Sequence, residues 1–294
     1  MDLIDAQQKL ASNSPSKRSQ LLIDYWIREQ FSVKDAMDTY FNLGGYSFPV
    51  TTQSAEAQAW FDRGILWTYG YNHEEAILCF ERAIDADPKC AMAHWGAGYA
   101  SGPNYNMPWD LFDNAGRAAA ARAGYVHARK ALDMIAGVTR WEAALIHALP
   151  ARYPQRDLLD PEAMKVWNAD FADAMRDVFA AHPENHEVRT VFAESLLNLT
   201  PWKMWDLPSG QPAANARTIE AQKVLEEALE GDPSAMHHPG LLHLYVHLME
   251  MSPFPEKALK AGDALRRLVP DAGHLIHMPT HIDILCGHYQ NVVD

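Results

Sequence analysis

Fourteen histidines are unevenly spread along the 294 residues, and eight of them lie between residues 237 and 288. His243 and His247 are four residues apart, and so are His277 and His281. Residues at positions i and i+4 share one face of an α-helix, so each pair can present two imidazoles together. Corresponding members of the two pairs are 34 residues apart. Because neutral imidazole is a common ligand of zinc and copper, this pattern predicts a transition-metal site.

Three further residues extend this constellation. His238 precedes the first pair, and His274 lies three residues before His277. Glu250 follows His247 by three residues, which gives an HxxE element of the kind found in metal sites of helical proteins. We expect Glu250 to be a further ligand or the catalytic general base. The histidines expected to bind metal are His238, His243, His247, His274, His277 and His281.

A ligand set dominated by histidine favours copper or zinc, as one or two ions, over a di-iron carboxylate centre. Zinc with an open coordination position would activate a water molecule for hydrolysis. Copper would allow oxygen-dependent oxidation, which we slightly favour because histidines outnumber carboxylates. Two other interpretations remain open, namely a pH-sensitive or anion-binding groove and histidines with purely structural roles.

Other residues are expected to support the ligands or to close the site. Asp283 and His288 are expected to orient the ligand rings by hydrogen bonding. Segments 101–110 and 200–217 are rich in Pro, Asn, Gly and Trp, which predicts two long loops, either packed on the surface or folded over the site. The loop residues expected to close over the site are Asn104, Tyr105, Trp109, Trp202 and Trp205.

The chain also carries an internal repeat. Small, aromatic and proline residues stand at regular offsets in the segment Ala57–Cys90, namely Trp60, Gly64, Ala76, Phe80, Ala83 and Pro88. The same frame recurs from Pro239 onward and, more weakly, in the segment between. Small residues allow close helix crossing, and aromatic side chains fill the space between helices. This 34-residue pattern resembles the tetratricopeptide repeat.

The repeat predicts an all-α fold, a right-handed superhelical α-solenoid of tetratricopeptide-like helix pairs with two loop insertions. Residues 1–56 are expected to form a helical or extended lead-in, and residues 57–294 the solenoid. The last repeat is incomplete, because its second helix has only begun when the chain ends. We therefore expect either a fragment of a longer protein or a partner, such as a second copy, that covers the open repeat.

Two stretches, NHEEAILCFERAIDADPKC and HHPGLLHLYVHLME with GHLIHMPTH, resemble a group of bacterial and fungal tetratricopeptide proteins. The resemblance implies that positions 2, 5 and 9 of each first helix line a concave groove. Counting from Pro239 and from Gly273 puts both histidine pairs at positions 5 and 9. These positions fall within about 60° of one helix face, and packed helices lie roughly 8–10 Å apart. Imidazoles from both helices could therefore meet at one ion, although no settled reaction comes with the resemblance.

Composition narrows the classes of function. The formal net charge of −13 argues against nucleic-acid binding, which relies on Lys and Arg. No apolar run reaches the roughly 18 residues that a transmembrane helix needs, and the polar start lacks an apolar signal core, so we expect a cytoplasmic protein.

The sequence favours a metal-dependent enzyme that acts on a small molecule. The alternative is a scaffold that binds a peptide or partner protein in the groove without catalysis.

Overall fold

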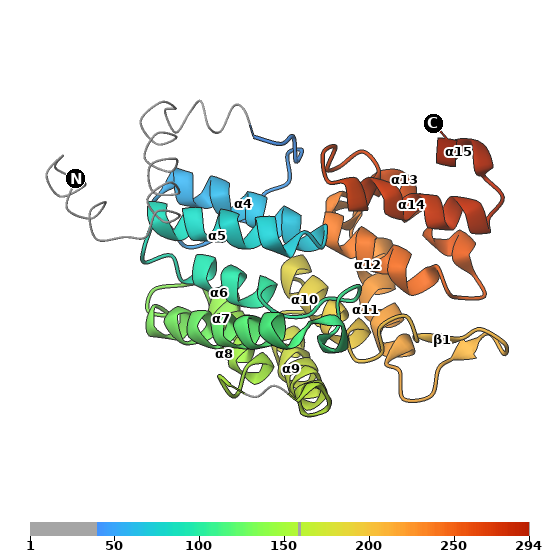
Figure 1. Cartoon of the computed structure of the whole chain (residues 1–294). Helices are drawn as coiled ribbons and strands as arrows, with labels where there is room; N and C mark the ends of the chain where they lie inside the picture. The colour runs from blue at the N-terminus through green and yellow to red at the C-terminus, as the bar shows by residue number, and fades with distance from the viewer. Residues whose placement is uncertain (1–39, 158–159, 294) are drawn as a thin grey trace, which may run out of the picture. The chain divides into compact units, whose positions relative to one another are not determined.

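The computed structural model describes residues 40–157 and 160–293 (Figure 1). Residues 1–39 of the predicted lead-in lie outside the described residues. Leu43–Asp294 form one compact unit, which contains all the helices and strands of the described residues. These elements are almost all helical, which confirms the prediction of an all-α fold.

Twelve α-helices occur in the described residues. The first six are α4 (Ala55–Tyr69), α5 (His73–Ala86), α6 (Ala91–Ala100), α7 (Asn114–Asp133), α8 (Arg140–Arg152) and α9 (Pro161–Ala181). The other six are α10 (His186–Leu197), α11 (Thr218–Gly231), α12 (Pro239–Met249), α13 (Leu259–Leu265), α14 (Gly273–Leu285) and α15 (Tyr289–Val293). Short 3₁₀ helices are η1 (Trp109–Leu111), η2 (Pro233–His237) and η3 (Pro255–Ala258).

Short polar side chains begin several of these helices. Ser54, Asn72 and Asn185 each accept a hydrogen bond from a backbone N–H in the first turn of α4, α5 and α10. Such caps satisfy backbone donors that have no partner within the helix. In α8, Thr139 and Glu142 form a reciprocal capping box. The starts of these four helices are therefore encoded locally in the sequence.

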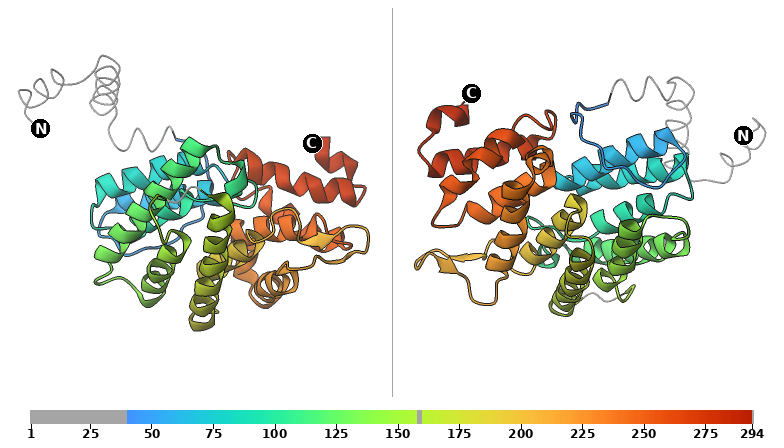
Figure 2. Two further views of the ribbon diagram at one scale, coloured as in Figure 1. Left: turned by 60° about the horizontal axis from the view of Figure 1, so that its bottom comes forward. Right: turned by 180° about the vertical axis from the view of Figure 1, so that it is seen from behind.

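Each helix from α4 to α14 packs against the next one in the chain. Alternate helices also pack against one another, so that α4 contacts α6, α6 contacts α8, α10 contacts α12, and α12 contacts α14. Helix α12 additionally packs against α4, which lies far from it in sequence (Figures 1 and 2). This contact brings the end of α4 beside the histidine-bearing helices α12 and α14.

Phe80 of α5 shows why small residues are needed where helices cross. An added Cβ at Gly64 of α4 would lie 2.6 Å from the Phe80 ring, and one at Gly96 of α6 would lie 2.4 Å from it. Phe80 is fully buried, so its ring has little room to move. The two glycines thus let α4 and α6 approach the aromatic side chain closely, as the repeat frame predicts for Gly64.

The two predicted loops contain no α-helix. The first forms a tight turn, in which Asn104 and Met107 pair, followed by η1. The second contains a short hairpin of β1 (Trp205–Asp206) and β2 (Gln211–Pro212), which projects at the right of Figure 1. Among the described residues, no helix is both long enough and apolar enough to cross a bilayer.

Replacing Gly96 with Ala should destabilise the protein by about 1–3 kcal/mol, because the new methyl group would overlap the ring of Phe80, which has little room to move. Chemical denaturation at neutral pH measures the change. Gly231→Ala is the matched control, since this residue ends α11 at an exposed position with nothing within 4 Å of an added Cβ. Equal stability of the Gly96→Ala variant and the wild type would contradict the packing described here.

Candidate metal centre

Three of the predicted ligands converge. His243 and His247 of α12 and His274 of α14 each offer a nitrogen, and these three nitrogens lie within 4.8 Å of one another. The Nε2 atoms of His243 and His274 are 3.0 Å apart. Among the described residues this is the one group of three or more ligand-type side chains that could share an ion.

Helix α12, which carries His243 and His247, is buried on every side. All its residues from Pro239 to Met249 are buried, which is the pattern of a central helix rather than a surface one. Its first helical position is Pro239, whose restricted φ suits the start of a helix. The ring of His274 comes from the first turn of α14 and remains partly exposed. One side of the cluster is therefore accessible.

Hydrogen bonds fix the orientation of two of the rings. The Nδ1 of His247 lies 2.8 Å from Glu250 Oε1, and a carboxylate can only accept, so Nδ1 carries the proton and Nε2 carries the lone pair. His243 makes a hydrogen bond to the backbone of Tyr69. Carboxylates and carbonyls that bind the second ring nitrogen in this way orient metal-ligating histidines.

The Nε2 atom of His247 is a nitrogen of the cluster that the described residues leave without a partner. It is buried and has no hydrogen-bond partner among the described residues, although a buried polar atom without a partner is costly. Nitrogens that share a tetrahedral zinc ion lie about 3.3 Å apart, given a Zn–N distance of about 2.0–2.1 Å. Small rotations of the three side chains would therefore close the cluster around an ion.

The protonation states also suit a metal site. Burial, and then the nearby His247 and His274, hold the pKa of His243 well below its usual value. Burial lowers the pKa of His247, and burial with the neighbouring histidines lowers the pKa of His274 to about 4. All three imidazoles are consequently neutral at pH 7, which is the form that binds metals.

The carboxylate of Glu250 is bonded to two histidines, which does not suit the general base that the sequence suggests. Its Oε1 accepts from His247 Nδ1 at 2.8 Å, and its Oε2 accepts from His281 Nδ1 at 2.5 Å. Burial would raise its pKa, but the two histidine hydrogen bonds outweigh burial and lower the pKa to about 2. With both oxygens engaged and little affinity for a proton, Glu250 positions the two rings instead.

His277 and His281 lie outside the three-histidine cluster, contrary to the prediction that they share its ion. Their Nε2 atoms are 2.8 Å apart, and His281 is joined to the cluster through Glu250. The reason is the stagger of α12 and α14. His243 faces His274 and Glu250 faces His281, both 31 residues apart rather than 34. The difference of three residues is about one helical turn.

His238 lies outside the three-histidine cluster, so the structure does not bring it to the site that the sequence predicts for it. Its Nδ1 accepts a hydrogen bond from Leu241 N and thereby caps α12. Its Nε2 lies 3.3 Å from Oε1 of Glu187, a carboxylate that also accepts from the hydroxyls of Tyr46 and Tyr69. His238 thus helps to join α12 to α10 and to the segment around Tyr46 that precedes α4.

Neither Asp283 nor His288 orients a ligand ring. Asp283 is buried and binds the guanidinium of Arg266 at 2.7 Å and the amide of Asn291 at 3.3 Å. His288 is exposed and lies 3.8 Å from Asp283. A buried carboxylate is costly unless a charged group pairs with it, and Arg266 is that group for Asp283. Asp283 therefore stabilises the end of the described chain rather than a ligand ring.

The two loops do reach the site, but through other residues than Asn104 and Trp109. Trp109 is buried against Phe112 and Tyr153, away from the cluster. The Asn104 side chain accepts from two backbone N–H groups of its own turn and approaches the ring of His73. Both residues shape the first loop rather than cover the histidines.

The residues that approach the site are Tyr105 and Trp202, which lie on different loops. The ring of Tyr105 is 4.9 Å from that of His247, and the ring of Trp202 is 6.4 Å from that of Tyr105. Trp202 also donates a hydrogen bond to the side chain of Asn106 at 3.2 Å. The two loops therefore meet beside the cluster.

Tyr71 is the site residue that the sequence does not indicate. It follows α4, and its ring centroid lies 4.6 Å from His243, 5.3 Å from His274 and 5.6 Å from His247. Its φ of 57° is in the left-handed region, which is unusual for a bulky residue and common at functional sites. A backbone signal of this kind is visible only in the structure.

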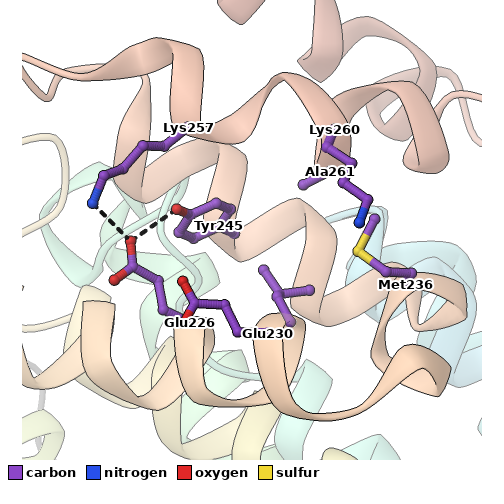
Figure 3. Close-up of a pocket in the computed structure, with 8 residues that line it drawn as sticks. Glu226, Glu230, Met236, Tyr245, Lys257, Lys260 and Ala261 are labelled. Carbon is purple, nitrogen blue, oxygen red and sulfur yellow. Dashed lines mark hydrogen bonds and ion pairs between the residues drawn. The ribbon is translucent and has the colours of Figure 1, made fainter.

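A pocket of about 430 Å³ leads to the cluster. It is lined by His274 and Tyr71 and by residues of α4, the α4–α5 turn, the first loop and the start of α14, including Trp67, Asn72 and Asn106. This volume is within the range of small-molecule sites. A second pocket, of about 350 Å³, lies among α11, α12 and α13, where Glu226 accepts from both Tyr245 and Lys257 (Figure 3).

No protein-family model matches the chain, and no curated protein matches it either. The assignment of this centre therefore depends on the residues themselves, their distances and their burial.

The metal-free protein should lose stability as the pH falls from 7 towards 4. The pKa of His274 is about 4 in the fold and about 6.5 in an unfolded chain, so the unfolded state binds the proton first and acid favours unfolding. Urea denaturation at several pH values in the presence of a chelator measures the slope. The slope should be shallower in a His274→Gln variant, with exposed His147→Gln as the control for loss of an imidazole. Identical slopes in wild type and His274→Gln would contradict the burial argument.

Proposed function

We propose that the protein is a metal-dependent enzyme whose ion is held by His243, His247 and His274. The observation that supports this best is the buried Nε2 of His247, which lacks a partner among the described residues and lies beside two other imidazoles. A metal ion would give all three nitrogens a partner at once. Glu250 and the backbone of Tyr69 would hold two of the rings in the required orientation.

Copper or zinc suits this donor set better than a hard cation, because the three nearest donors are all imidazole nitrogens. We propose one ion, since His277 and His281 offer only two nitrogens to another. A site with three protein ligands leaves a coordination position open to a small molecule, where the metal supplies Lewis-acid or redox chemistry. We favour oxidation over hydrolysis, because both oxygens of Glu250 are engaged and no free carboxylate base lies in the cluster.

The substrate would be a small molecule that enters through the pocket beside His274. The residues that line the pocket include the aromatic Trp67 and the polar Asn72 and Asn106. Such a lining suits an organic molecule with a planar part and some polar groups. The loops that meet at Tyr105 and Trp202 border the same region and would limit access of water.

We also propose that the helix pairs are of the tetratricopeptide type and form a right-handed superhelix. The supporting observations are the residue frame of Ala57–Cys90, the α4–α5 hairpin over that segment and the packing of alternate helices. The contact of α12 with α4 adds a feature that a simple linear array lacks, because repeats in such arrays contact only their neighbours.

The wild-type protein should bind about one copper or zinc ion per chain, and a His243→Ala/His274→Ala variant should bind it at least about 100-fold more weakly. Loss of two of three ligands leaves no chelate for the ion. Titration followed by elemental analysis of the desalted protein measures both quantities.

The control is His94→Ala/His127→Ala, another facing pair whose Nδ1 atoms are 3.1 Å apart and which belongs to no group of three ligands in the described residues. Its metal binding should equal that of the wild type. Absence of binding in the wild type, or retention in the His243/His274 variant, would exclude the proposed centre and favour the scaffold interpretation.

Changing Glu250 to Gln should weaken metal binding by about 10–100-fold, because an amide can accept from only one of the two rings that the carboxylate orients. Competition with a chromophoric chelator measures the dissociation constant. Glu226→Gln is the control, since this carboxylate is bonded to Tyr245 and Lys257 in the other pocket. Unchanged affinity in Glu250→Gln would show that the carboxylate does not position the ligands.

A further inference from the structure

Two tyrosine hydroxyls beside the three-histidine cluster lack acceptors for their protons. The Oη atoms of Tyr71 and Tyr105 are buried and have no hydrogen-bond partner among the described residues. The backbone N–H of Trp202 is directed at the Tyr105 oxygen without reaching hydrogen-bond geometry, and such a group can only donate. Each hydroxyl therefore has a proton to donate and nothing in the described chain to receive it.

These hydroxyls belong to the rings that enclose the cluster. Tyr71 contacts all three histidine rings and lies nearly parallel to that of His247, at an interplanar angle of 22°. Tyr105 contacts His247 from the first loop and is fully buried. Together with His247 Nε2, three buried polar atoms without partners are thus contributed by neighbouring rings. Each of these atoms would gain from a partner, because most buried polar groups in proteins are paired.

The backbone is in an unfavourable conformation at Tyr71 and at Trp202, which neighbours Tyr105. Tyr71 and Trp202 are two of the three non-glycine residues with positive φ in the described chain, at 57° and 56°. Strain of this kind persists where the surrounding structure requires a particular side-chain placement. Tyr71 also lines the 430 Å³ pocket, while its hydroxyl oxygen is buried.

We propose that the hydroxyls of Tyr71 and Tyr105 donate hydrogen bonds to an anionic oxygen of the substrate, bound beside the three histidines. This inference rests on the proposed metal centre and specifies its ligand as a small molecule with a carboxylate or similar oxygen anion. Two O–H donors match the lone pairs of such an oxygen, and a divalent ion held by neutral imidazoles attracts negative charge. The planar remainder of the molecule lies in the pocket against Trp67.

The test uses copper-loaded protein and azide, an anion whose binding to copper is followed by absorbance, with acetate as an oxygen-anion competitor. Tyr71→Phe and Tyr105→Phe should each weaken azide and acetate binding by about 10-fold, as expected for loss of one hydrogen bond to a charged group. Metal affinity should stay within about threefold of the wild type. Tyr245→Phe is the control, because its hydroxyl is bonded to Glu226 elsewhere.

Anion affinities that stay within about twofold in the Tyr71→Phe/Tyr105→Phe variant, while copper remains bound, would overturn this inference and leave the metal centre intact. Failure of the wild type to bind copper would overturn this inference, and failure to bind zinc as well would overturn the metal centre. A measurement without metal adds an independent check. Since the hydroxyls have no partners, both phenylalanine variants of the metal-free protein should melt no lower than the wild type. A fall of more than about 5 °C would show that the hydroxyls are bonded within the protein.

Discussion

A buried imidazole nitrogen without a hydrogen-bond partner is costly, and in this protein that nitrogen is Nε2 of His247. Helix α12 is buried on all sides, so the ring cannot turn to water. Its other nitrogen is committed to Glu250, so the ring cannot exchange one nitrogen for the other without breaking that bond. The neighbouring rings of His243 and His274 are neutral and add further lone pairs. A metal ion bound at this point, as proposed, would give all of these groups a partner.

The carboxylate of Glu250 organises the surroundings of that nitrogen. It joins His247 of α12 to His281 of α14, so one side chain determines the orientation of rings on two helices. A group that serves two hydrogen bonds in this way has a low pKa and is a poor proton acceptor. The site therefore holds a positioning carboxylate, and a reaction that needs a carboxylate base is less well served than one that needs only a bound metal and an oriented substrate.

The other half of the site comes from distant segments of the chain. The contact of α12 with α4 carries Tyr71 to the histidines, and the two loop insertions carry Tyr105 and Trp202 to the same place. Stacked helices give this arrangement a rigid support, while the aromatic side chains leave a pocket at one side. The division resembles that of many enzymes, in which a regular scaffold supports functional residues on its turns and loops.

The sequence by itself determined the helical fold, several helix starts and the two loops, and it indicated His243, His247 and His274 as candidate ligands. These features depend on local spacing, caps and turn residues, which act over a few positions. It could not determine which histidines meet. The 34-residue period predicts that equivalent positions face each other, but α12 and α14 are staggered by about one turn, so His274 replaces His277 and Glu250 binds His281. Nor could it place Tyr71, because the approach of α4 to α12 and the positive φ of that residue arise from packing between segments far apart in the chain. Only the tertiary structure decides such contacts, since stagger and long-range packing depend on the fit of whole helices.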